Sequence, residues 1–227
     1  MIYETKPHIF TLIENARYEE AIQALLGSKT LLFPKAQTYF LVGECYRLIG
    51  AYENAKLFLE VAYQLKSDAE HIAFALARIY MLLHRYDEAY ALFIKLRRHN
   101  ATNGHIRLRL GMLLLRKGRI KAAVGCLRGL LKEVKNGHIV LPQTPYGLPQ
   151  PTEETTSMRL FSAIVYNALG EAMLQLGDIK QAAALFWEAI LSKPLGSPFF
   201  EPYRNLDRVE EDAKHALKRI VNSAAIG

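Results

Sequence analysis

The sequence predicts an all-α solenoid, in which antiparallel helix pairs stack one after another. The first observation is a period of about 34 residues. Small residues recur at this interval in two series, which are Gly43, Ala77 and Gly111, then Ala55, Ala89 and Ala123. The second observation is that apolar residues within each period lie three or four apart, which is helical spacing. A fixed period of this length with helical spacing indicates a helix–turn–helix array.

One unit shows why these residue types recur. A first helix presents Tyr39, Gly43 and Tyr46 on one face, and a second helix presents Ala55 and Leu59 after a turn. Gly43 and Ala55 are small because we expect the two helices to pass closely there, while the larger side chains fill the volume beside them. A single pair cannot bury both of its faces, so the next pair must stack on it.

The order of these residues resembles the tetratricopeptide repeat (TPR) family. Copies begin at Ala36, Glu70, Gly104 and Ala163, and the last ends at the helix-stopping Pro194. The resemblance covers residues 36–194. It implies a right-handed superhelix and a non-enzymatic scaffold or adaptor that binds other proteins.

We expect one solenoid domain over residues 1–227, in five parts. These are a degenerate opening repeat (1–35), three repeats (36–134), an inserted loop (135–160), a fourth repeat (161–194), and a Pro- and Phe-containing segment with a capping helix (195–227). The capping helix is predicted from one apolar stripe, which comprises Leu206, Val209, Ala213, Ala216, Leu217 and Ile220. A terminal amphipathic helix of this kind covers the last repeat.

The inserted loop interrupts the period once. Pro142, Pro145, Pro149 and Pro151 disfavour helix, so the segment is predicted to be a long extended loop. Its apolar residues, within 139–148, are more than a solvated linker needs. Two alternatives stay open: a loop packed on the solenoid or on a partner, and a flexible insertion.

Composition bounds the cellular setting. Cys45 and Cys126 lie two repeats apart, too far for a disulfide in a solenoid, and two unpaired thiols suit a reducing compartment. No apolar run approaches the length of a membrane span, and the first seven residues are not a signal peptide. We therefore expect a cytoplasmic or nuclear protein with no membrane partner.

Charge is concentrated in the middle of the chain. Residues 95–135 hold twelve Lys and Arg against Glu133 alone, a net +11, whereas the whole chain carries +7. The candidate basic patch comprises Arg97, Arg98, Arg107, Arg109, Arg116, Lys117, Arg119 and Lys121. These cations could be solvated helix faces or could meet an acidic partner segment. Nucleic acid is the weaker alternative, because the window lacks an aromatic stacking pattern.

The resemblance also implies a concave groove lined by the first helices of the pairs. The matching positions are Phe40, Glu44, Arg47, Phe74, Arg78, Met81, Leu108, Met112, Leu115, Asn167, Glu171 and Leu174. Some TPR domains hold a chaperone's terminal carboxylate with Lys and Asn at such places, but here the first two repeats carry Phe40, Glu44, Phe74 and Arg78, so that clamp is absent. An apolar groove suits an amphipathic helix or a second copy of the chain. The alternative is that the insertion or the C-terminal helix fills it.

No catalytic residue, metal site or cofactor is predicted. The histidines do not lie at the spacing of a catalytic constellation with Cys, Asp or Ser, and the phosphate-loop and dinucleotide-binding motifs are absent. His71 and His105, one period apart, lack further metal ligands in the pattern.

Three narrower functions compete. The layout of an irregular insertion followed by a repeat and a Pro- and Phe-containing segment resembles the N-terminal arms of the TPR subunits of the anaphase-promoting complex. That resemblance implies a nuclear, cell-cycle role in a ubiquitin-ligase assembly. The alternatives are a bacterial TPR adaptor or secretion chaperone, and a nucleic-acid-associated TPR protein that uses residues 95–135.

Overall fold

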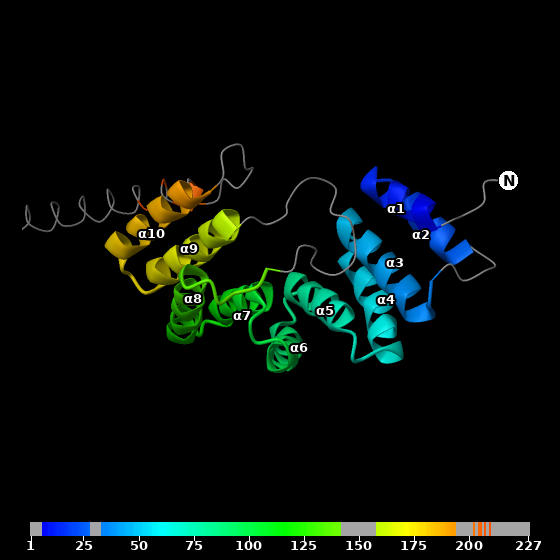
Figure 1. Cartoon of the computed structure of the whole chain (residues 1–227), viewed down its shortest axis with the longest axis horizontal. Helices are drawn as coiled ribbons and strands as arrows, with labels where there is room; N and C mark the ends of the chain where they lie inside the picture. The colour runs from blue at the N-terminus through cyan, green and yellow to red at the C-terminus, as the bar shows by residue number, and fades with distance from the viewer. Residues whose placement is uncertain are drawn as a thin grey trace, which may run out of the picture. The chain divides into compact units, whose positions relative to one another are not determined.

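The structure is a computed structural model that describes most of the chain (Figure 1). Described are residues 6–27, 33–141 and 158–193, together with Pro202, Arg204, Asn205, Asp207 and Val209. The inserted loop beyond residue 141, the segment 194–201 and most of the predicted capping helix lie outside these residues.

The described residues form ten helices in sequential antiparallel pairs, which confirms the predicted all-α repeat fold. The helices are α1 (Lys6–Glu14), α2 (Tyr18–Gly27), α3 (Lys35–Ile49), α4 (Tyr52–Leu65), α5 (Glu70–Leu82), α6 (Tyr86–His99), α7 (Gly104–Arg116), α8 (Ile120–Lys135), α9 (Met158–Gln175) and α10 (Ile179–Ser192). The described residues divide into two compact units, one within residues 6–106 and the other within residues 107–209. The first unit holds α1 to α6, the second holds α8 to α10, and the division falls within α7.

The turn inside each pair contains one residue with a left-handed backbone. These residues are Ala16, Gly50, His84, Gly118 and Gly177, with φ between 57° and 88°. Each of the first four follows the previous one by a full period, so the turn of α1 and α2 keeps the phase of the later repeats. At Gly50 the left-handed conformation lets the backbone N–H donate to the carbonyls that end α3, which satisfies part of the helix terminus.

Close helix packing explains the glycines on the first helices. A Cβ atom on Gly43 would lie 2.6 Å from Cγ of Leu59, and one on Gly170 would lie 2.5 Å from the ring of Phe186. Leu59 and Phe186 are both fully buried, so neither can move aside cheaply. The small residue at this position therefore admits a large side chain from the second helix, as the sequence predicts for Gly43.

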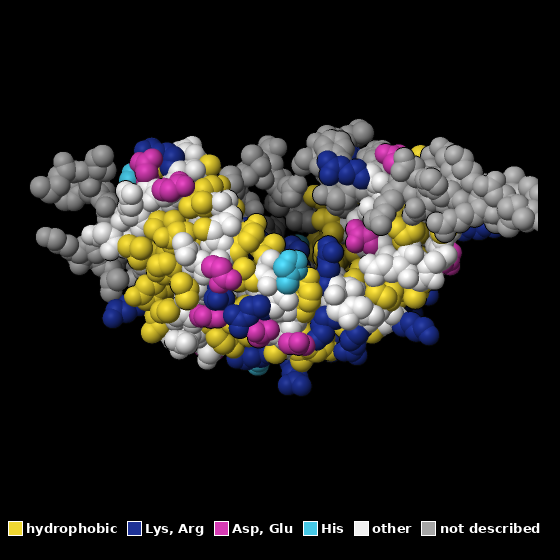
Figure 2. Space-filling view, turned by 180° about the vertical axis from the view of Figure 1, so that it is seen from behind, with side chains coloured by type: hydrophobic (Ala, Val, Ile, Leu, Met, Phe, Trp, Pro, Cys, Tyr) yellow, Lys and Arg dark blue, Asp and Glu magenta, His cyan; other side chains and the backbone are white. Residues whose placement is uncertain are grey.

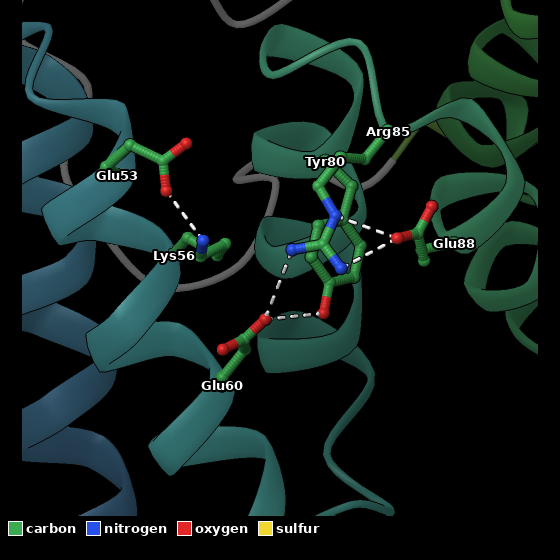
Figure 3. Close-up of polar contacts among 6 residues, drawn as sticks. All are labelled: Glu53, Lys56, Glu60, Tyr80, Arg85 and Glu88. Carbon is green, nitrogen blue, oxygen red and sulfur yellow. Dashed lines mark hydrogen bonds and ion pairs between the residues drawn. The ribbon is translucent and has the colours of Figure 1, made fainter.

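A cluster of polar side chains connects α5 and α6 to α4 (Figure 3). Tyr80 donates from its hydroxyl to Oε1 of Glu60 at 2.9 Å, and the guanidinium carbon of Arg85 lies 4.8 Å above the Tyr80 ring. Arg85 also pairs with Glu88 at 2.7 Å and lies 3.9 Å from Glu60. Burial, followed by the hydrogen bond to Glu60, raises the pKa of Tyr80 to about 12.

The boundaries of the insertion differ slightly from the predicted ones. Helix α9 begins at Met158, inside the range expected for the loop, and its residues Leu160 and Phe161 are buried. The first turn of α9 thus already contributes buried apolar side chains, which explains why the helix begins before the predicted end of the loop. At the other boundary Ile139 is buried and Val140 is exposed. Of the apolar stripe predicted for the capping helix, Val209 is described, and it is buried.

Candidate functional site

The candidate site is the inner line, by which we mean the twelve groove positions that the sequence predicts on α3, α5, α7 and α9. Its members on α3 and α5 belong to the first unit, and those on α7 and α9 belong to the second. Four apolar members, Phe40, Phe74, Leu108 and Leu115, are 1–7% exposed. These side chains are part of the packed interior of their units.

The two buried phenylalanines of the first unit have aromatic neighbours. The ring of Phe40 meets the His71 ring edge to face, with centroids 4.9 Å apart, and Phe74 meets Phe93 in the same way at 5.7 Å. Edge-to-face pairs of this kind fix ring orientation as well as burying area. The partly exposed apolar members of the inner line are Met81, Met112 and Leu174.

His71 also ties α5 to α3, a contact that sequence reasoning missed. Its Nε2 lies 3.1 Å from Oε1 of Gln37. Burial, with a smaller contribution from the nearby Lys66 charge, lowers the pKa of His71. The neutral imidazole is therefore favoured, and it braces the two first helices beside Phe40. The separation of Gln37 and His71 by one full period was the available signal.

The polar part of the inner line in the first unit is the pair Glu44 and Arg47. The guanidinium of Arg47 donates from Nε and Nη2 to the same carboxylate oxygen, Oε2 of Glu44, at 3.0 and 2.9 Å. The other oxygen, Oε1, is buried and accepts no hydrogen bond in the described part of the chain. A buried acceptor without a donor costs roughly 1–3 kcal/mol. Arg78, one repeat further along, is partly buried.

In the second unit two groove positions of α9, Asn167 and Glu171, take part in a network of side-chain hydrogen bonds. Asn205, from the C-terminal segment, donates from Nδ2 to Oδ1 of Asn167 at 2.9 Å and lies 3.4 Å from Oε1 of Glu171. Asn167 in turn donates to Glu171 at 2.9 Å. The sequence predicts Asn167 and Glu171 as groove positions, with filling by the C-terminal helix as one alternative, and Asn205 donates to both of them. Nothing in the spacing marked Asn205 as their partner.

The eight residues of the candidate basic patch belong to different units. Arg97 and Arg98, exposed at the end of α6, lie in the first unit, and the other six lie in the second. Arg107 forms an ion pair with Glu133 that links α7 to α8, so its charge is compensated. Arg109 and Lys117 are partly buried, whereas Arg116, Arg119 and Lys121 are exposed.

The first unit also exposes apolar side chains on a second helix. Leu57, Val61 and Leu65 lie four apart on α4 and are 39–57% exposed. Figure 2 shows hydrophobic side chains gathered on one face of this unit. This exposed apolar stripe lies on α4, whereas the candidate groove positions lie on α3, α5, α7 and α9.

A pocket of about 350 Å³ lies between the α4–α5 turn and α6. Lys95 closes one side, because its ammonium donates to the Tyr63 hydroxyl at 2.9 Å and to the Ser67 carbonyl at 3.1 Å. Asp68 and His99 also line it. Because Lys95 is committed to these contacts, we interpret the pocket as a structural gap between repeats rather than a site for chemistry.

The comparisons agree with the repeat architecture. Family models described as tetratricopeptide repeat match residues 36–68 and 83–139. No curated relative matches the sequence. Together the two matches cover 90 of the 227 residues, and they agree with the repeat fold seen in the structure. Members of that family are generally non-enzymatic scaffolds for protein–protein interaction.

Solved structures share the fold at low identity. MamA 41-end from Desulfovibrio magneticus RS-1 is 12% identical, with a TM-score of 0.63 over 82% of this chain and 92% of that one. MamA of AMB-1 is 22% identical, with a TM-score of 0.57 over 84% and 90%. YrrB, described as a TPR protein with an unusual peptide-binding site, is 16% identical, with a TM-score of 0.59 over 86% and 87%. These neighbours are not subunits of the anaphase-promoting complex, so the narrower resemblance, with its nuclear and cell-cycle role, gains no support from them.

Two further observations concern the described residues alone. They contain no group of three or more His, Cys, Asp or Glu side chains arranged to hold a metal ion. Among them, every helix is too short or too polar to cross a membrane.

Proposed function

We propose that this chain is an adaptor that holds an extended segment of a partner protein against α3 and α5, at the pair formed by Glu44 and Arg47. The single observation that carries this proposal is the buried, unsatisfied Oε1 of Glu44 beside a guanidinium that retains N–H donors. The structural likeness to YrrB, which is described as having a peptide-binding site, adds support for this class of ligand.

The chemistry of the pair matches a peptide backbone. Arg47 makes its two bonds through Nε and Nη2, so further N–H groups of the fork remain for a carbonyl. Glu44 Oε1 is buried in the chain alone, so it can accept from a partner's amide N–H once the side chain rotates towards the surface. Each residue of an extended peptide offers one donor and one acceptor, which is the complement of this pair. The side chain of Arg47 is 12% exposed against 5% for Glu44, so Arg47 is the member that a partner meets first.

Among the narrower functions, an adaptor of the bacterial TPR kind is favoured over a subunit of an anaphase-promoting assembly. The favouring observation is that the structural neighbours reported above are bacterial TPR proteins. A cytoplasmic location is consistent with such an adaptor. Capture of an apolar helix, or of a second copy, along the inner line has less support, because Phe40 and Phe74 are committed to packing.

A peptide selection tests the proposal. Random linear peptides are selected on the immobilised full chain, and their affinities are then measured for Glu44→Gln and Arg47→Lys. Both variants keep size and helix propensity but disturb the pair, so the selected peptides should lose at least roughly tenfold in affinity, the usual effect of disrupting one buried charged contact. Arg17→Lys is the matched control, because Arg17 forms an exposed pair with Glu20 at the same spacing of three residues.

Equal binding by the variants would contradict the proposal. If peptides selected on the wild-type chain bind all three variants equally, while circular dichroism shows them folded, the Glu44 and Arg47 pair is not the contact and the proposed site is wrong.

A further inference from the structure

One face of α8 carries four exposed cations. Lys121, Arg128, Lys132 and Lys135 follow one another at intervals of seven, four and three residues. This spacing places them on one side of the helix, over about 21 Å of its length. Within the described ranges, none of the four forms an ion pair with a carboxylate. We call this surface the α8 cation face.

Two members of the α8 cation face are held in place by neutral groups. Arg128 donates from Nη2 to Oε1 of Gln181 at 2.8 Å, and the ammonium of Lys135 lies 5.7 Å from the centre of the Tyr166 ring. These contacts order the side chains while leaving their charge uncompensated. The first turn of α8 holds no acidic residue, and Arg119 occupies its N-cap. The positive end of the helix dipole therefore adds to the field of the cations.

Small residues lie along one edge of this face. Ala122 and Gly125 are exposed, and Gly129 is partly exposed. A Cβ atom on Gly125 would meet nothing within 4 Å, and one on Gly129 would meet only the flexible end of Arg107 at 3.9 Å. Packing among the described residues thus places no demand for glycine at either position. The helix backbone is instead left bare beside the cations.

We propose that the α8 cation face docks an acidic α-helix of a partner protein, whose carboxylates recur every three or four residues. Charge complementarity carries the proposal: a row of carboxylates at helical spacing would meet all four cations at once. The bare edge at Gly125 and Gly129 lets a second helix approach closely. A nucleic acid fits less well, because α8 contains no aromatic side chain on which a base could stack.

This interaction is independent of the proposed peptide site. Glu44 and Arg47 belong to the first unit, whereas α8 belongs to the second. Loss of peptide binding at one surface therefore leaves the other intact, and the two proposals fail separately.

The test uses two designed peptides with identical composition, each long enough to span the α8 cation face as a helix. In the first, glutamates recur at three- and four-residue spacing along one face with alanines beside them, and in the second the same glutamates are distributed around the helix. Binding of each labelled peptide to the full chain is measured by fluorescence anisotropy at low salt. We expect the first peptide to bind more tightly. Lys121→Glu with Lys132→Glu should weaken its binding at least roughly tenfold, through repulsion at encounter and in the complex.

A matched charge control excludes a simple effect of net charge. Arg97→Glu with Arg98→Glu changes the net charge by the same amount, at exposed positions of the first unit. This control should bind the first peptide as the wild-type chain does. An equal loss in both double variants would overturn the proposal.

The glycines give a second test in which folding and binding change in opposite directions. Gly125→Ala with Gly129→Ala should raise the melting temperature by roughly 2–4 °C per substitution, because alanine favours helix and its methyl group meets open space. The same methyl groups should weaken binding of the first peptide roughly tenfold by keeping its helix away. Gly27→Ala, which also meets nothing within 4 Å, should leave binding unchanged.

Three further outcomes would contradict the inference. The first is equal binding of the two peptides to the wild-type chain. The second is unchanged binding after the two glycine substitutions in a folded protein. The third is tighter binding of a single-stranded oligonucleotide of matched length than of the first peptide, with full dependence on the four cations, which would assign the face to nucleic acid.

Discussion

Nε2 of His71 lies 3.1 Å from Oε1 of Gln37, which occupies the equivalent position one period earlier in the chain. Two residues separated by one period of the sequence are therefore in direct contact, because equivalent positions on successive first helices of this unit lie side by side. Asn205 and Asn167, from the C-terminal segment and α9, make a similar side-chain contact in the second unit. Such links brace each repeat against the next, and each element of a repeat array depends on its neighbours for burial.

The left-handed turn residues predict a stabilising substitution. Ala16 adopts φ of 57°, which costs an L-residue with a side chain about 1 kcal/mol relative to glycine. Ala16→Gly should therefore increase the free energy of unfolding by about that amount, as measured by urea denaturation. Gly50→Ala, at the same turn position with φ of 88°, should decrease it by a similar amount. Changes of the same sign in both variants would refute this interpretation.

The close packing of Gly170 predicts a destabilising substitution. A methyl group there would lie 2.5 Å from the ring of Phe186, which is fully buried. Gly170→Ala should therefore lower the free energy of unfolding by about 1–3 kcal/mol, despite the better helix propensity of alanine. Gly170→Ala with Phe186→Leu should recover part of the loss, because the smaller side chain makes room. Thermal denaturation of both variants measures the effect, and a neutral Gly170→Ala would disprove it.

Tyr80 predicts a dependence of stability on alkaline pH. Its pKa is raised to about 12 in the folded protein from an ordinary value near 10, chiefly by burial. Between these values the folded state binds more protons at Tyr80 than the unfolded state does. Stability should therefore fall as pH rises from about 10 to about 12. Tyr80→Phe should show a shallower decline than wild type in this window, measured by denaturation across pH, and parallel curves would contradict the assignment.

The two thiols should differ in reactivity. Cys45 is fully buried, and burial, reinforced by the neighbouring Glu44 charge, raises its pKa to about 12. Cys126 is partly exposed, and its Sγ lies 3.7 Å from the carbonyl oxygen of Arg107. Because the thiolate is the nucleophile, iodoacetamide should modify Cys126 of the native protein well before Cys45. Mass spectrometry of the digested protein gives the order, and urea should abolish the difference.

The sequence by itself determined the repeat architecture of this protein. A fixed period with small residues at the helix crossing is a local pattern, and the packing of Gly43 against Leu59 follows from it directly. Each repeat meets only its neighbours, so little information from distant parts of the chain was needed. The pairs of helices could therefore be predicted in order, apart from details such as the start of α9 at Met158.

Only the tertiary structure decided which side chains remain available to a partner. Phe40 and Phe74 have the spacing of groove residues, but their burial depends on rings that approach from other helices. Likewise, Glu133 compensates Arg107, whereas Lys132, one residue earlier, has no carboxylate partner among the residues described. The physical reason is that helical spacing fixes the direction of a side chain relative to its own helix. What covers that side chain is determined by neighbouring helices, whose contacts the pattern does not encode.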